Sequence, residues 1–266
     1  MKKISTLKKG ISLLAAVFTL LLLAGCGKKD YGTDFTTEPI TDNGYIIEKL
    51  DVQVLGITGE YKILLVADLH IICKNNEIND EDLATVEGRI KAFSPDGGRT
   101  TALNMWKDMP EMLDDCNADI ILFAGDMIDF CSEENVSALK EGLSSLETPY
   151  CYIRSDHDNC PYYLKNPNDE TCYSSQNDIC VNSDVWYVDL GEVIILCYNR
   201  SDKAMTEQGL EVAQEAIALG KPIILLTHVP FDSIVDSSLD ETNREAFNGR
   251  NITWGPGYTT DYSALE

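Results

Sequence analysis

The sequence has few histidines and far fewer basic than acidic side chains. Its 266 residues include 3 His and only 21 Lys and Arg, against 44 Asp and Glu, which gives a formal net charge of −23. A strongly acidic surface repels nucleic acid and anionic lipid at long range. No basic, aromatic-studded segment offsets this, so we do not expect a nuclease that acts on long polymers. Acidity alone is equally typical of an exported domain that must stay soluble.

Other familiar patterns are absent as well. The 9 cysteines show no Cys-x-x-Cys and no zinc-knuckle spacing, and the sequence contains no internal repeat. The main apolar run, Ile11–Leu23, is shorter than the roughly 20 residues that a membrane-spanning helix needs. The sequence therefore gives no sign of a zinc-finger module, a repeat protein or a spanning helix in this segment.

The N-terminus instead has the charge order of a secretory signal. Four lysines precede or border the run Ile11–Leu23, as in signal peptides, and the residues up to Cys26 resemble a bacterial lipobox. We expect a lipoprotein signal over 1–25, acylation of Cys26 and a flexible tether over 26–44. The mature chain would keep 17 basic against 44 acidic side chains, a net charge of −27, and would be anchored by lipid on the extracytoplasmic side of the cell membrane. An ordinary signal peptide with an incidental Cys26 is the alternative.

The remainder, 45–266, alternates between apolar strand patterns and helical patterns. An entering strand is expected over 45–57, and a paired antiparallel element over 185–190 and 193–198. The spacing of apolar residues predicts further strands and helices; the strands are 61–67, 119–124, 150–153 and 222–227, and the helices are 81–93, 101–116, 133–146 and 206–219. Alternation of this kind predicts an α/β fold with parallel strands and crossover helices. A single domain of this size buries a sizeable core without help.

Carboxylates and histidines follow four of these strands. Because the carboxyl ends of parallel strands line the crevice where α/β proteins bind ligands, such residues converge although they are far apart in sequence. Carboxylate and imidazole together suit divalent Mn, Fe or Zn. The residues are Asp68 and His70 after the first strand, Asp126 and Asp129 after the second, Asp156, His157 and Asp158 after the third, and His228 after the fourth.

Each motif has a plainer interpretation when it is taken alone. A single Asp-x-His after a strand is weak evidence, and His228 by itself would more often be an ordinary core or surface histidine. Gly125 permits a turn that a side chain would block, and a carboxylate directly after a buried strand needs a partner, but Asp126 would also suit a helix cap. The joint occurrence of all four motifs favours a metal-centred site.

With these motifs the chain resembles the calcineurin-like metallophosphoesterase family over roughly residues 60 to 230. The family's successive motifs are Asp-x-His, Gly-Asp-x-x-Asp, Gly-Asn-His-Asp/Glu, a lone His and Gly-His-x-His. The first two and the lone histidine match, whereas Ser155 replaces the glycine of the third motif and Asp156 replaces its asparagine. No Gly-His-x-His follows His228.

The resemblance implies a sandwich of two mixed β-sheets flanked by helices. It also implies that Asp68 and His70 hold one metal, that Asp126 bridges two, and that Asp156 and His228 hold the second. His157 would face the substrate, a small phosphomonoester or phosphodiester, with Asp158 fixing its tautomer. Two such cations lower the pKa of a bound water and neutralise phosphoryl charge.

The missing last motif leaves alternatives open. The segment 251–266 has the pattern of a turn-rich loop that starts into a helix, so we expect a fold that is incomplete at the C-terminus. A truncated or degenerate lipoprotein that keeps the fold as a non-catalytic binding module is one alternative. A zinc-dependent hydrolase of a different ester is another.

The cysteines leave their pairing open. Export permits disulfides, and Cys160, Cys172 and Cys180 lie in a polar insertion over 159–182. A bridge there would fix a loop beside His157. Cys151 and Cys197 lie in apolar strands and are expected to be inert core thiols.

Overall fold

The computed structural model describes residues 35–40, 45–74, 80–94, 96–97, 99–162, 169–199 and 205–229. The chain divides into two compact units, Met1–Val54 and Leu55–Glu266. The predicted signal, the lipobox and the C-terminal segment 251–266 lie outside the described residues. Within the described ranges, no helix has the length and apolar character needed to cross a membrane.

The first unit contains a β-hairpin. Strand β1 (Phe35–Ile40) pairs antiparallel with β2 (Tyr45–Leu50), with Phe35 opposite Leu50. The sequence predicted no strand in β1, which lies inside the expected tether, and it extended the β2 strand to residue 57. Phe, Thr and Ile favour strands, but Glu38 and Pro39 hid this preference among polar neighbours. This prediction was too long, because β2 ends at Leu50.

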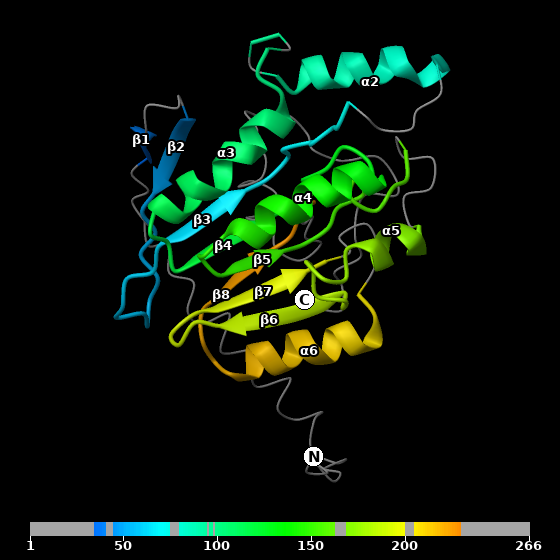
Figure 1. Cartoon of the computed structure of the whole chain (residues 1–266). Helices are drawn as coiled ribbons and strands as arrows, with labels where there is room; N and C mark the ends of the chain where they lie inside the picture. The colour runs from blue at the N-terminus through cyan, green and yellow to red at the C-terminus, as the bar shows by residue number, and fades with distance from the viewer. Residues whose placement is uncertain are drawn as a thin grey trace, which may run out of the picture. The chain divides into compact units, whose positions relative to one another are not determined.

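The described residues of the second unit form two three-stranded sheets (Figure 1). In the first sheet, β3 (Ile63–Val66), β4 (Ile120–Phe123) and β5 (Tyr150–Tyr152) are all parallel. The second sheet is mixed, because β6 (Val185–Asp189) runs antiparallel to β7 (Ile194–Tyr198), which runs parallel to β8 (Ile223–Leu226). The α/β class and the two sheets are confirmed. The three described strands of the first sheet are all parallel, whereas two mixed sheets were expected.

Four of the helices in the second unit begin and end within one residue of the predicted bounds. They are α2 (Asp80–Ala92), α3 (Ala102–Asp115), α4 (Glu133–Ser145) and α6 (Glu207–Ala218). Their starts were predictable because hydroxyl side chains cap three of them, at Thr101, Ser132 and Thr206. The short helix α5 (Glu170–Ser175) was not predicted, since it lies in the polar insertion.

Alternate residues of the strands build the core between the two sheets. Successive side chains of a strand point to opposite faces, so one set from β4 meets one set from β7. The resulting buried cluster consists of Ile120, Leu122, Ala124, Cys151, Ile153, Ile195, Cys197 and Leu226. Its two cysteines confirm the prediction of core thiols.

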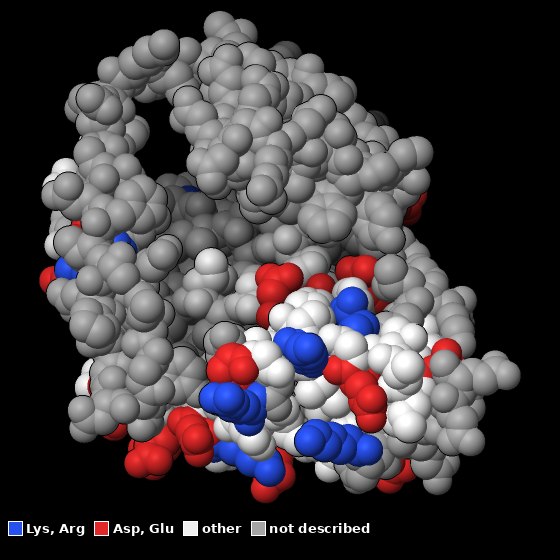
Figure 2. Space-filling view, turned by 90° about the horizontal axis from the view of Figure 1, so that it is seen from above, with Lys and Arg blue, Asp and Glu red and all other residues white. Residues whose placement is uncertain are grey.

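The other face of each sheet is covered by helices. Phe123 of β4 meets Trp106 of α3 edge to face, and the Trp106 indole N–H donates to the Ala138 carbonyl of α4 at 3.0 Å. On the second sheet, Tyr198 packs with Ala213 of α6. Figure 1 accordingly shows α3 and α4 on one side of this unit and α6 on the other, with the two sheets between them. The described part of the face in Figure 2 carries Lys and Arg interspersed with Asp and Glu rather than a continuous basic field.

Candidate metal centre

The loops that follow β3 and β4 run side by side. The Asp68 N–H donates to the Gly125 carbonyl at 3.1 Å, and the His70 N–H donates to the Asp126 carbonyl at 2.9 Å. An isolated parallel bridge joins Ile71 to Ile128 just beyond them. The first two sequence motifs are thus held together by backbone hydrogen bonds, as the positions of their strands predicted.

Three of the predicted ligands have left-handed backbone conformations. The φ angles of Asp68, His70 and Asp126 are 55°, 52° and 52°, and Gly125 has φ 90°. Residues other than glycine seldom adopt this region, and it persists only where the surrounding structure enforces it, often at functional sites. The strained turns bring these side chains together beyond the ends of the strands.

Two groups of possible metal ligands share Asp126. The first half-site comprises Asp68, His70 and Asp126, and the second half-site comprises Asp126, Asp156 and His228; the ligand atoms within each half-site lie within 4.8 Å of one another. His70 Nε2 lies 3.5 Å from Asp126 Oδ2, and His228 Nε2 lies 3.5 Å from the same oxygen. All five predicted ligands are therefore brought together by the fold.

These separations suit a divalent cation. Nitrogen and oxygen ligands bind Zn²⁺ at about 2.0–2.2 Å, so two ligands of one ion lie about 3–3.5 Å apart. His70 Nε2 to Asp126 Oδ2 fits this value, and Asp68 Oδ1 lies slightly farther from the same nitrogen, at 3.9 Å. Each half-site offers three side chains, a number that leaves a coordination position for water or substrate in catalytic zinc sites.

The shared carboxylate is buried and has an altered acidity. Asp126 is 5% exposed, and burial raises its pKa to about 6, with His228 opposing the rise and Asp158 adding to it. Its Oδ1 accepts a hydrogen bond from the Ser155 hydroxyl, while Oδ2 faces both histidines. Ser155, which replaces the family's glycine, was not predicted as a site residue, and its departure from the motif was the only signal.

Backbone atoms support the histidine of the second half-site. His228 Nδ1 lies 2.8 Å from the Ala124 carbonyl; a carbonyl only accepts, so Nδ1 donates and Nε2 remains for a metal. Burial lowers the pKa of His228, but Asp126 and the Ala124 carbonyl outweigh it and raise that pKa. A Cβ on Gly125 would lie 2.9 Å from Ser155 Cβ and 3.1 Å from His228 Nδ1, so glycine is needed here.

Side chains support the histidine of the first half-site. His70 Nδ1 lies 2.9 Å from Asp129 Oδ1, and the fully buried Asp129 also accepts from Arg89 Nε at 2.6 Å and from Arg89 Nη2. Burial raises the pKa of Asp129, but the hydrogen bonds from His70 and Arg89 outweigh it and lower that pKa. The Phe93 ring stacks on His70 at 3.9 Å. No sequence motif had indicated a role for Arg89 or Phe93.

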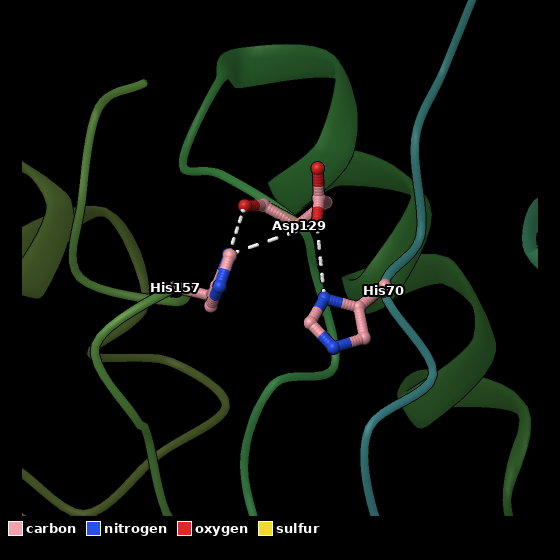
Figure 3. A group of neighbouring side chains, drawn as sticks. All are labelled: His70, Asp129 and His157. Carbon is pink, nitrogen blue, oxygen red and sulfur yellow. Dashed lines mark hydrogen bonds and ion pairs between the residues drawn. The ribbon is translucent and has the colours of Figure 1, made fainter. Parts of the chain in front are cut away.

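His157 lies beside these residues and is oriented by Asp129 (Figure 3). Its Nδ1 lies 2.6 Å from the Asp129 carbonyl oxygen. Burial lowers the pKa of His157, but Asp126 and the Asp129 carbonyl raise it above the usual value. Although His70, Asp129 and His157 also form a possible ligand group, Asp129 already binds Arg89, so we interpret them as a hydrogen-bonded network.

Asp158 has a different role from the one expected. Its carboxylate is fully buried and accepts hydrogen bonds from the backbone N–H groups of Asp126, Ile128 and Ser155 at 2.8, 3.1 and 2.9 Å. A carboxylate with several backbone donors at hand fixes a loop. The prediction that Asp158 fixes the His157 tautomer is corrected, since the Asp129 carbonyl makes that contact and Asp158 instead ties the second motif to the third.

The cysteines near the centre are thiols. The seven cysteines from Cys116 to Cys197 form no disulfide, and they include Cys160, Cys172 and Cys180 of the insertion. Cys180 donates to the Tyr152 carbonyl at 3.1 Å. In this structure the insertion is held by hydrogen bonds, such as that from Tyr152 to Gln176 at 2.9 Å, rather than by a bridge.

The chain is similar to known proteins in sequence and in structure. Residues 61–259 match the family model described as calcineurin-like phosphoesterase. A dimetal phosphatase from Danio rerio resembles the structure with a TM-score of 0.45 and 10% sequence identity, over 65% of this chain and 70% of that chain. No curated protein matched the sequence. The match of the family model to most of the chain shows that the chain belongs to the calcineurin-like phosphoesterase family.

Proposed function

We propose that this chain hydrolyses a small phosphomonoester or phosphodiester at a centre of two divalent metal ions. As a family member, it is a metal-dependent hydrolase of phosphoester bonds; the size of the substrate and the number of ions are the proposal. The observation that supports it is the shared Asp126 Oδ2, 3.5 Å from the Nε2 atoms of both His70 and His228. A single oxygen between two imidazoles suits a bridging ligand.

The ligand types favour Mn, Fe or Zn, since carboxylate and imidazole are both present in each half-site. When bound, two such ions lower the pKa of a water and neutralise charge on the phosphoryl oxygens. Asp156 adds a negative charge that the family's asparagine lacks, which favours tight metal binding and weakens the attraction for an anionic substrate. The absent Gly-His-x-His does not preclude this chemistry, because three protein ligands per ion suffice at catalytic zinc sites.

The chain's own contribution to bond cleavage comes from His157. Its Nδ1 donates to the Asp129 carbonyl, so in the neutral ring Nε2 lacks a proton, and protonation of Nε2 makes it a donor. Asp126 and the Asp129 carbonyl raise the pKa of His157 against the effect of burial, which extends the protonated form to higher pH than in a free imidazole. His157 then donates a proton to the leaving oxygen or stabilises the transition state.

A small substrate agrees with the charge distribution. The chain carries 44 acidic against 21 basic side chains, and basic residues are mixed with acidic ones on the described part of the face in Figure 2. An extended polyanion gains little from such a surface. A compact phosphoester is attracted locally by the ions alone.

The proposal is tested by a substrate screen on the full chain after loading with Mn, Fe or Zn. The probes are p-nitrophenyl phosphate and bis(p-nitrophenyl) phosphate, which separate monoesterase from diesterase activity. Asp126→Ala should abolish the activity, whereas Asp115→Ala, at an exposed position at the end of α3, should leave it unchanged. Equal activity of the wild type and Asp126→Ala would refute the proposal.

We also propose that Cys26 is acylated and that the mature enzyme is anchored by lipid, facing the extracytoplasmic side of the membrane. The support is the lipobox-like sequence that ends at Cys26. Mass spectrometry of the membrane fraction should show a processed chain that begins with a lipidated Cys26. A soluble, non-lipidated chain that begins at another residue would contradict this.

A further inference from the structure

The geometry points to helix α2 as an outer support of the metal centre, with Arg89 as a positioning residue for the first half-site. This inference rests on the proposed function, because it concerns the affinity of the same centre for its ions. It goes beyond the sequence motifs, since no motif includes Arg89 or any other residue of α2. Arg89 is proposed to act through Asp129 and His70, and not by contact with the substrate.

Apolar packing seats α2 on the loops of the centre. Val86 of α2 is buried against Ile72 and Phe130, and Ile90 packs against the same cluster. Ile72 follows His70 by two residues, and Phe130 directly follows Asp129. The helix is therefore fixed to the two segments whose side chains it supports, and Arg89 reaches Asp129 from a defined position.

The Arg89 guanidinium binds Asp129 through two nitrogens. Nε donates to Oδ2 at 2.6 Å, and Nη2 donates to Oδ1. Such a paired contact fixes the plane of the carboxylate as well as its position. Asp129 is 0% exposed, so removal of the arginine leaves a buried charge without its cationic partner, which is costly.

The fixed carboxylate in turn orients His70. Asp129 Oδ1 accepts from Nδ1 of the imidazole at 2.9 Å, which leaves Nε2 directed to Asp68 and Asp126. Phe93, directly after α2, stacks on the same ring at an interplanar angle of 15°, and the Arg89 guanidinium lies over Phe93 at 4.9 Å. The short segment from Arg89 to Phe93 therefore fixes the orientation of the His70 imidazole through Asp129 and covers one face of its ring.

Carboxylates that orient a metal-binding histidine influence the affinity for the metal. Loss of such an outer partner typically lowers metal affinity or activity about 10- to 100-fold. The second half-site has another support, the Ala124 carbonyl behind His228. We therefore expect substitution of Arg89 to lower the affinity for the ion at Asp68 and His70. The affinity for the ion at Asp156 and His228 should stay unchanged.

The test is a two-site metal titration of the full chain by calorimetry, with Mn²⁺ or Zn²⁺ added after removal of metal by chelator. Arg89→Met should lower one of two association constants about 10- to 100-fold and leave the other within twofold. Arg89→Lys keeps the charge but loses the paired contact. Its association constant for this ion should lie between those of Arg89→Met and the wild type. Lys91→Met, at an exposed position on the same helix, is the matched control and should bind as the wild type does.

The outcomes separate this inference from the proposed function. A wild-type chain that binds no metal refutes the proposed function and this inference with it. A wild type that binds two ions while Arg89→Met and Arg89→Lys bind both unchanged refutes the inference alone, and so does an equal loss at both sites. Thermal unfolding of the metal-free variants identifies any general loss of folding; should Arg89→Met fail to fold, Arg89→Lys against Lys91→Met decides.

Discussion

The two half-sites hold equivalent histidines by different means. His70 of the first half-site is supported by side chains, since its Nδ1 binds Asp129, which binds Arg89 of α2. His228 of the second is supported by backbone, since its Nδ1 binds the Ala124 carbonyl at the end of β4. Backbone support depends only on the sheet, whereas side-chain support requires a helix that packs in the right place. The first half-site is therefore the one that substitutions distant in sequence can change.

The largest effect on turnover without loss of metal is expected at His157, which belongs to neither half-site. His157→Ala should lower turnover by about 10²- to 10⁴-fold, the usual contribution of a general acid or base, because the leaving oxygen loses its proton donor. Phosphoesterase assays with parallel elemental analysis check this. If the variant loses its metals in proportion to its activity, His157 is a ligand and the assignment is wrong.

Substitution of one histidine at a time tests metal binding at each half-site separately. His70→Ala and His228→Ala should each lose one of two ions, because the other half-site keeps all three of its ligands. Turnover should fall roughly a hundredfold or more in both, since each ion contributes several kcal/mol of transition-state stabilisation. Loss of both ions in either variant would show that the two half-sites bind only as a unit.

Gly125→Ala tests the backbone support of the second half-site. Gly125 has φ 90°, and an added Cβ would meet Ser155 and His228 at 2.9 and 3.1 Å. The strain should cost about 1–3 kcal/mol of folding free energy. It should also lower the affinity for the ion at His228 more than the affinity for the ion at His70. Chemical denaturation and metal titration measure the two effects. Gly88→Ala, in open space on α2, is the control. Unchanged stability of Gly125→Ala would show that a side chain is tolerated at this turn.

Phe93→Leu should give the smallest effect. The substitution removes the ring stacked on His70 and keeps an apolar side chain, and aromatic pairs contribute about 0.5–1.5 kcal/mol beyond their buried area. Affinity at the first half-site should therefore fall by roughly tenfold or less, and the second should be unaffected. A lower affinity for the ion at His228 would instead indicate that Phe93 acts on the whole centre.

The convergence of the candidate ligands was predictable from the sequence because they follow apolar strands. Parallel strands place their carboxyl ends together, so Asp68, Asp126, Asp156 and His228 converge whatever the details of packing. Backbone hydrogen bonds between the first two motifs and between His228 and Ala124 then set their separations. This part of the site depends on local patterns and topology, which a single sequence reveals.

The supporting residues were not predictable in this way. Arg89 lies on a helix whose charged residues look like an ordinary solvated face, and its contact with Asp129 depends on how Val86 packs against Phe130. The misassigned role of Asp158 has the same cause, since adjacency in sequence to His157 suggested a contact that the turn does not make. The β1 strand was missed because its partner, and not its own pattern, defines it.

Elemental analysis of the full chain shows whether it binds two ions through a shared Asp126. The chain is purified without chelator after expression with Mn, Fe and Zn available, beside Asp126→Ala. We expect two metal ions per wild-type chain and a loss of both in the variant. A folded wild-type chain without metal, or a variant that retains both ions, would contradict this expectation.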